Sequence, residues 1–218
     1  ARAHHVGIAI AYNVWQYYQA TGNWGFLIDY GAEMLTDIAR FWVSRARFDS
    51  TRNRYVVTGV IGPDEFHCGY PGRDYDGIDN NAYTNVMAVW VILRALDVLE
   101  WVPLSHRLNL LEKLGIDDDE IAQWEDVSRR MFVPFHDGVI SQFEGYDELE
   151  ELDWDAYRAK YGDIQRLDRI LKAEGDTPDR YKLAKQADAV MLFFLFGDEE
   201  LRRVFTRLGY EFPDDAAR

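Results

Sequence analysis

The 218-residue sequence has only one cysteine, Cys68, and fewer basic than acidic residues. A single cysteine excludes a disulfide within the chain and fits a reducing compartment, so we expect a cytoplasmic protein. The 24 Lys and Arg residues against 38 Asp and Glu residues leave a net charge of −14. Nucleic acids and anionic membranes are bound through basic patches, so we expect neither of them as a partner.

Long uninterrupted apolar runs are also missing. None approaches the roughly 18 residues of a membrane-spanning helix, and no signal peptide is visible. Hydrophobic residues nevertheless make up 48% of the chain, which can supply a sizeable core for one large or two small domains. The 7 Trp, 13 Tyr and 12 Phe residues are many for a plain helical core. Because aromatic rings at the rim of a cleft also stack on sugars, the composition is compatible with a carbohydrate ligand.

Most of the chain has the apolar spacing of helices. We expect helices over residues 8–19, 24–48, 82–101, 120–131 and 199–208. A glycine followed closely by Asn or Asp separates consecutive helices at Gly22, Gly115 and Gly197. This arrangement is typical of tight αα-hairpins, in which the glycine ends one helix and the polar side chain caps the next.

Irregular segments lie between these hairpins. We expect a short strand within residues 54–60, a loop over 68–78, a β-turn at 136–138, and a polar helix or helical loop over 153–173. Thr177 and Pro178 should begin a further helix that ends in the apolar run 189–196. The composite is an all-α chain with a few short β-strands in loops. Its alternation of long loops and tight hairpins suits an α/α toroid, truncated at both ends, with residues 1–218 as one partial domain.

Two carboxylates, Asp64 and Glu65, follow the turn formed by Gly62 and Pro63. This turn places both acids on a loop, where catalytic groups concentrate. A carboxyl beside Phe66 could be partly desolvated, which would raise its pKa towards that of a general acid. Glu65 is therefore the candidate proton donor for glycoside cleavage, where the leaving oxygen must be protonated. The alternative is a surface turn in which an Asp caps a helix.

Other polar residues are candidates for binding a substrate. Lys185 and Gln186, adjacent on the expected helix, can bind sugar hydroxyls, although a surface lysine is the simpler interpretation. Asn81 could line a polar cleft or cap the helix that follows it. His4 and His5 match no zinc spacing, so we expect no metal. P-loop, dinucleotide and Gly-x-Ser-x-Gly motifs do not occur, and we expect no cofactor.

Taken in order, these motifs resemble a known family. Its members are the maltose, trehalose and kojibiose phosphorylases, which are grouped among the glycoside hydrolases. The resemblance spans nearly the whole chain and is carried by residues 10–18, 60–67, 79–85, 143–146 and 185–188. The Gly-Pro-Asp-Glu run at 62–65 and the Lys-Gln-Ala-Asp run at 185–188 are the most specific of them. The resemblance implies an (α/α)6 barrel, of which this chain is a fragment.

The resemblance also implies roles for individual residues. Glu65 would be the general acid, with Asp64 beside it in the substrate site, and Lys185 and Gln186 would hold the glucosyl unit. His4 and His5 would help to shape the site for the leaving sugar, and Asn81 belongs to a second matched motif. Inorganic phosphate would be the co-substrate, attacking an α-glucosidic disaccharide to give β-glucose 1-phosphate and a free sugar. We expect the full-length protein to be a homodimer.

Several parts of the family pattern lie outside these 218 residues. They are an N-terminal β-sandwich, a sugar-gripping Trp-Asp pair and a phosphate-binding loop. The sequence therefore leaves open an inverting hydrolase of the acid-trehalase type, or a helical scaffold that binds sugars or proteins without catalysis. The insertion at 68–78 leaves the acceptor sugar undetermined. We expect the isolated chain to be inactive and to self-associate through uncovered apolar helix faces, including that of residues 8–18.

Overall fold

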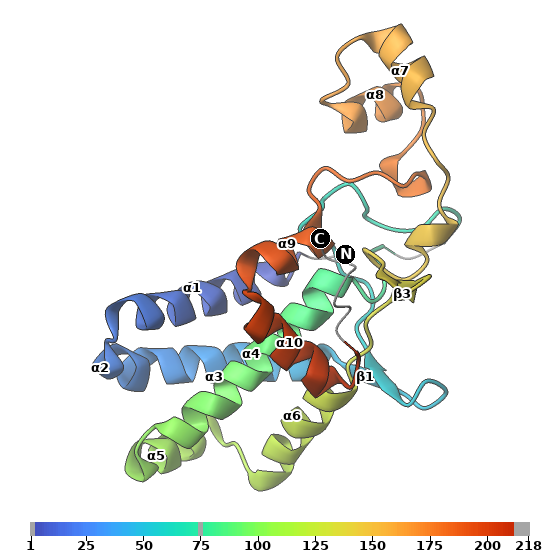
Figure 1. Cartoon of the computed structure of the whole chain (residues 1–218). Coiled ribbons are helices and arrows are strands. Elements are labelled where there is room, and N and C mark those ends of the chain that lie inside the picture. Colours follow the sequence, from blue (N-terminus) through green and yellow to red (C-terminus); the bar gives the residue numbers. More distant parts are fainter. Residues whose placement is uncertain (1–2, 74–75, 212–218) are drawn as a thin grey trace.

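The computed structural model describes residues 3–73 and 76–211 and is mostly helical (Figure 1). Its helices are α1 (His5–Thr21), α2 (Trp24–Phe26), the π-helical turn η1 (Leu27–Gly31), α3 (Ala32–Arg45), α4 (Ala82–Trp101), α5 (Leu104–Leu114), α6 (Asp118–Arg130), α7 (Trp154–Tyr161), α8 (Leu167–Ala173), α9 (Asp188–Leu195) and α10 (Asp198–Leu208), with 3-10 turns η2 (Tyr146–Glu148) and η3 (Pro178–Arg180). Two antiparallel hairpins pair β1 (Arg47–Asp49) with β2 (Arg54–Val56), and β3 (Phe135–His136) with β4 (Val139–Ile140). The predicted helical class with a few short strands is confirmed.

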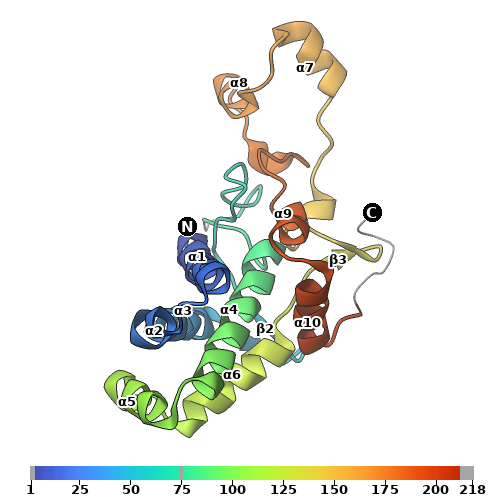
Figure 2. The same cartoon turned by 60° about the vertical axis from the view of Figure 1, so that its left-hand side comes forward.

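Helix α4 runs through the middle of the molecule (Figures 1 and 2). It contacts α1, α3, α6, α9 and α10, and every residue from 82 to 95 is buried. A helix that is apolar on all sides is stable in water only when other elements cover it. By length and composition α4 could also cross a membrane, but 89% of its apolar window is buried inside the domain. This burial is what a core helix shows.

Two of the three predicted hairpin joints have the expected geometry. Gly22 and Gly115 are left-handed and end α1 and α5, while Asn23 and Asp117 cap the helices that follow. The third prediction is wrong in detail. Gly197 has φ −70° and itself precedes α10, whose first residue is Asp198.

The apolar face of residues 8–18 is covered, against expectation. Ile8, Ala11 and Trp15 are buried against the rest of the core. The hydroxyl of Tyr12 donates a hydrogen bond to the carbonyl oxygen of Leu195, at the end of α9. This face therefore does not supply the surface through which self-association was expected.

One predicted helix ends early, and one predicted polar helix or helical loop is divided in two. The helix expected to reach residue 48 ends at Arg45, because Phe48 pairs with Tyr55 in the first β-hairpin and their rings lie 5.2 Å apart. The polar stretch 153–173 forms two short helices that are separated at the left-handed Gly162.

The helix predicted from Thr177 onward is wrong over most of its length. Thr177 does cap a turn, but that turn is only the 3-10 segment η3, and regular helix resumes at Asp188. The backbone amide of Lys182 donates to Glu150, and that of Lys185 donates to the side chain of Asp64. These long-range partners replace the carbonyls that a helix would offer, so the segment stays non-helical.

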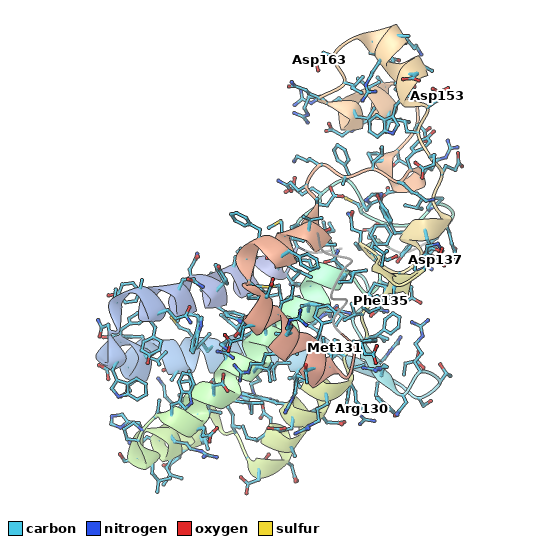
Figure 3. The ribbon with its side chains drawn as sticks, viewed as in Figure 1. Arg130, Met131, Phe135, Asp137, Asp153 and Asp163 are labelled. Atoms are coloured by element: carbon cyan, nitrogen blue, oxygen red, sulfur yellow. The ribbon has the colours of Figure 1, made fainter. Side chains whose placement is uncertain are left out.

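Residues 150–183 form an arm that projects from the helical body and carries α7 and α8 (Figures 1 and 2). Asp153 and Asp163 lie at the two ends of α7 near the tip of the arm (Figure 3). The arm has a small apolar core of its own, made of Leu152, Leu167, Leu171 and Leu183. Phe66, from the loop that carries the two acids, packs against this core. The arm is thereby fastened to the acid loop.

Candidate active site

The acid loop, residues 60–67, lies between β2 and α4. Its base is closed by two hydrogen bonds between Val60 and Ile78, at 3.1 and 2.8 Å. The two carboxylates differ in their exposure to solvent. Asp64 is 1% exposed, whereas the side chain of Glu65 is 66% exposed. One acid can therefore hold the loop in place while the other faces solvent.

Asp64 is the anchor of the loop. Its carboxylate accepts hydrogen bonds from Gln142 Nε2 at 2.6 Å and from the backbone amide of Lys185 at 3.0 Å, and the His67 ring lies 3.5 Å away. Burial alone would raise the pKa of Asp64, but the hydrogen bonds from His67, Gln142 and two backbone amides leave it below its ordinary value. Because its oxygens are occupied within the protein, the geometry gives Asp64 a supporting position behind the site.

Glu65 is the acid that faces solvent. Its Oε2 lies 2.9 Å from Nζ of Lys185, and this hydrogen bond and charge lower the pKa of Glu65. The expectation that neighbouring rings desolvate this carboxyl and raise its pKa is wrong in this structure. The ring of His67 is buried against Phe143, and Phe66 packs into the arm, so neither covers Glu65.

Lys185 and Gln186 lie in the loop before α9 and not on a helix, which corrects the prediction of adjacent helical positions. Both side chains are exposed. The structure brings Lys185 directly onto Glu65 although 120 residues separate them. Gln186 follows on the same exposed stretch.

The two histidines do not act as a pair. His5 Nδ1 lies 3.2 Å from the carbonyl oxygen of Ile61 in the acid loop. The ring of His4 instead lies against Phe41, at 5.1 Å between centroids. His5 thus adjoins the candidate site, whereas His4 packs against α3.

Asn81 is fully buried, and its side-chain oxygen caps α4 by accepting a hydrogen bond from the amide of Thr84. Its Nδ2 donates to Asp188 at 2.9 Å and to the carbonyl oxygen of Gln142 at 3.1 Å. The capping interpretation is thus the one that the structure supports. Direct contact with a substrate would require this side chain to leave its present partners.

Sequence reasoning missed two buried polar residues of this region, Gln142 and Asp188. Burial raises the pKa of Asp188 to about 6, although the hydrogen bond from Asn81 opposes that rise. Both residues adjoin motifs that did stand out, because Asp188 ends the Lys-Gln-Ala-Asp run and Gln142 precedes Phe143. Their position beside these motifs was the only feature of the sequence that could have marked them as site residues.

A cavity of about 410 Å³ opens next to Lys185, between the acid loop and the arm. Its lining includes Phe66 from the acid loop, and Trp154 and Gln165 from the arm. This volume lies within the range typical of ligand sites. Among the residues that the structure describes, no group of three His, Cys, Asp or Glu side chains is placed to hold a metal ion.

The site thus consists of an exposed acid paired with a lysine on a loop over a helical core, and the lysine lines a cavity. Residues 1–215 match the model of the glycosyl hydrolase family 65 central catalytic domain. The chain therefore belongs to glycosyl hydrolase family 65, a family of glycoside phosphorylases and hydrolases.

Similar proteins include an uncharacterized glycosyl hydrolase of Mycobacterium tuberculosis, 66% identical over 97% of this chain and 16% of the relative. A trehalose 6-phosphate phosphorylase of Lactococcus lactis is 39% identical over 98% of the chain and 26% of its own length. A kojibiose phosphorylase of Thermoanaerobacter brockii is 34% identical over 96% of the chain and 26% of its own length. The chain thus spans between 16% and 26% of the length of these relatives.

A solved structure described as a putative kojibiose phosphorylase from human microbiome shares the fold. It superposes with a TM-score of 0.72 at 22% identity, covering 93% of this chain and 27% of that one. At this identity the likeness concerns the fold alone.

Proposed function

We propose that the protein carrying this chain is an inverting glycoside phosphorylase that cleaves an α-glucosidic disaccharide with inorganic phosphate. The observation that carries the proposal is the exposed carboxylate of Glu65, held 2.9 Å from Lys185 on a loop that buried Asp64 fixes. The names of the phosphorylase relatives support the reaction type. We further propose that the helices form part of an (α/α)6 barrel and that the full-length protein is a homodimer.

In the proposed reaction a phosphate oxygen bonds to the anomeric carbon while the bond from that carbon to the glycosidic oxygen breaks. The leaving oxygen takes the proton of Glu65, and the proton of hydrogen phosphate restores the acid, so the products are β-glucose 1-phosphate and a free sugar. Phosphate is already ionised, and no second carboxylate is required to activate it. Proton donation from Glu65 is the step in which this chain takes a direct part.

Lys185 has two tasks in this proposal. In the free protein its hydrogen bond and its charge lower the pKa of Glu65 and so favour the ionised form of that carboxyl. When the hydroxyls of a glucosyl unit engage Lys185 and Gln186, this pairing is weakened and the pKa of Glu65 rises towards that of an acid. The sugar on the leaving side would then occupy the cavity beside Lys185.

The second candidate is an inverting hydrolase of the same family, and the uncharacterized glycosyl hydrolase relative, at 66% identity, favours it. A hydrolase activates water with a second carboxylate. In this chain the two other carboxylates next to Glu65 and Lys185 in sequence, Asp64 and Asp188, are both buried and hydrogen-bonded. Neither is placed to activate water, so a hydrolase would need a base from another part of the protein.

Phosphate dependence decides between the two reactions. The full-length protein is incubated with maltose, kojibiose, trehalose and trehalose 6-phosphate, each with and without inorganic phosphate. Turnover that requires phosphate and gives β-glucose 1-phosphate, identified by NMR, is the expected result. Release of glucose at the same rate without phosphate would instead establish the hydrolase.

Replacing Lys185 by Ala should raise the KM for the disaccharide and move the pKa of Glu65 upward, towards its ordinary value. Removing the opposite charge removes the interaction that now favours the ionised carboxyl. The pH profile of kcat/KM measures this change, because it reports the groups of the free enzyme. Its alkaline limb, where Glu65 loses its proton, should move to higher pH.

The matched control is Lys182→Ala, which removes a lysine three residues earlier whose Nζ lies 3.4 Å from Glu151. This variant should leave the alkaline limb where it is in the wild type. An unchanged limb and an unchanged KM in Lys185→Ala, with folding intact, would return Lys185 to the surface-charge interpretation.

A further inference from the structure

We propose that Asp188 is a positioning residue for the acid Glu65, acting with Asp64 through a pair of reciprocal contacts that we call the clasp. The proposal rests on the function proposed above. In the clasp, each of the two buried carboxylates contacts the backbone of the segment that carries the other. One segment presents Glu65 and the other presents Lys185.

The first half of the clasp is formed by Asp188, which is fully buried at the start of α9. Its carboxylate accepts hydrogen bonds from Asn81 Nδ2 at 2.9 Å and from the amide of Ala189 at 3.0 Å. The backbone of the acid loop passes directly against this carboxylate at Gly62, where an added Cβ atom would lie 2.7 Å from Oδ2 of Asp188. Asp188 therefore contacts the acid loop three residues before Glu65.

The second half runs in the opposite direction. Oδ1 of Asp64 accepts the backbone amide of Lys185 at 3.0 Å. Asp64 thus binds the loop before α9 at Lys185, three residues before Asp188. With both backbones held, the side chains of Glu65 and Lys185 emerge next to each other and meet at 2.9 Å.

The clasp is tied to the rigid core on its inner side. Asn81 binds Asp188 and the carbonyl oxygen of Gln142 through the same Nδ2 atom, and its own oxygen caps α4. Gln142 in turn donates to Asp64 at 2.6 Å. The acid loop that carries Glu65 is therefore connected to the first turn of α4 through Asp188 and Asn81.

A buried carboxylate is costly unless hydrogen bonds compensate for its burial. Asp188 accepts one N–H donor on each of its two oxygens, from Asn81 and from the amide of Ala189. A side chain that replaces Asp188 must supply both acceptors to keep these two bonds. Asparagine retains one oxygen and replaces the other with a donor, and alanine retains neither. This gives a graded series of variants, Asp188→Asn and Asp188→Ala.

The test compares two glucosyl donors in the full-length protein. A disaccharide requires protonation of its leaving oxygen, whereas α-glucosyl fluoride releases fluoride with little need of an acid. If Asp188 positions Glu65, both variants should lose about tenfold to 10²-fold in kcat on the disaccharide with phosphate, since misplaced acid groups lose that much. They should stay within about threefold of the wild type on the fluoride, and Asn should lose less than Ala.

Glu65→Gln serves as the reference, because loss of the acid itself should give the same division between donors. Asp198→Asn, at an exposed carboxylate in the first turn of α10, is the matched control and should change neither rate. Equal losses on both donors in the Asp188 variants would show a general structural defect, and wild-type rates on both would show no role, so either result overturns the inference. In both cases a wild type that uses phosphate and a Glu65→Gln variant that loses the disaccharide would leave the proposed function standing. A wild type without turnover on either donor would overturn both.

Discussion

Full-length protein with Glu65→Gln is expected to lose about 10²–10⁴-fold of its disaccharide phosphorolysis, which is the range that general acid catalysis contributes. Glutamine matches glutamate in shape but has no proton to donate to the leaving oxygen. The side chain of Glu65 is 66% exposed and bonds to Lys185, an interaction that contributes little to the stability of an exposed pair. The fold should therefore be retained. Initial rates with maltose, trehalose and kojibiose, together with thermal unfolding, measure the two effects.

Glu151→Gln is the matched control for this change. Glu151 is another exposed glutamate paired with a lysine of the 181–187 segment, Lys182, at 3.4 Å. It lies at the base of the arm and not on the acid loop, so its loss should leave the rate unchanged. A Glu65→Gln enzyme that cleaves the disaccharides at the wild-type rate would remove Glu65 from the role of acid.

The helices of the core could be predicted from the sequence because their determinants are local. The apolar residues of 82–101 fill all sides of α4, whose predicted bounds are those observed. Asn23 and Asp117 cap the helices for which they were predicted, through bonds that span three residues. Contacts of this range are contained in the sequence pattern itself.

The geometry of the site depends on contacts between residues far apart in the chain. Lys185 was expected on a helix, but its backbone amide is bound by Asp64, 121 residues earlier. The pKa of Glu65 was expected to rise through its neighbours in sequence, but Lys185, brought in by that same contact, lowers it. Local pattern selected Glu65 and Lys185 as candidates, yet the environment of both residues is set by tertiary contacts that no local pattern contains.

The buried partners were missed for a related reason. Asp188 and Gln142 are buried polar residues, and a single sequence does not distinguish a buried carboxylate from a solvated one. Their role becomes visible only when burial and partners are known together, as when Asn81 is found to join Asp188 to the cap of α4. The predicted substrate contact of Asn81 likewise depended on an exposure that the fold does not give it.

Gly62→Ala tests the same clasp by steric means, and we expect it to lose at least tenfold in kcat on the disaccharide. A Cβ atom at Gly62 would lie 2.7 Å from Asn81 Nδ2 and 2.7 Å from Asp188 Oδ2, closer than such atoms approach. Those two atoms are hydrogen-bonded to each other at 2.9 Å, so neither can move away without breaking that bond. The acid loop must shift instead, and overpacking of this kind costs about 1–3 kcal/mol of stability. Steady-state rates and thermal unfolding of the full-length variant measure both losses.

Gly197→Ala provides the matched control for this substitution. Gly197 has φ −70°, which any residue adopts, and a Cβ atom there would have no other atom within 4 Å. The same exchange of a hydrogen for a methyl group should therefore leave rate and stability near those of the wild type. If Gly62→Ala behaved like Gly197→Ala in both measurements, the loop could accommodate a methyl group against Asn81 and Asp188. The close approach of the backbone would then not be what sets the position of Glu65.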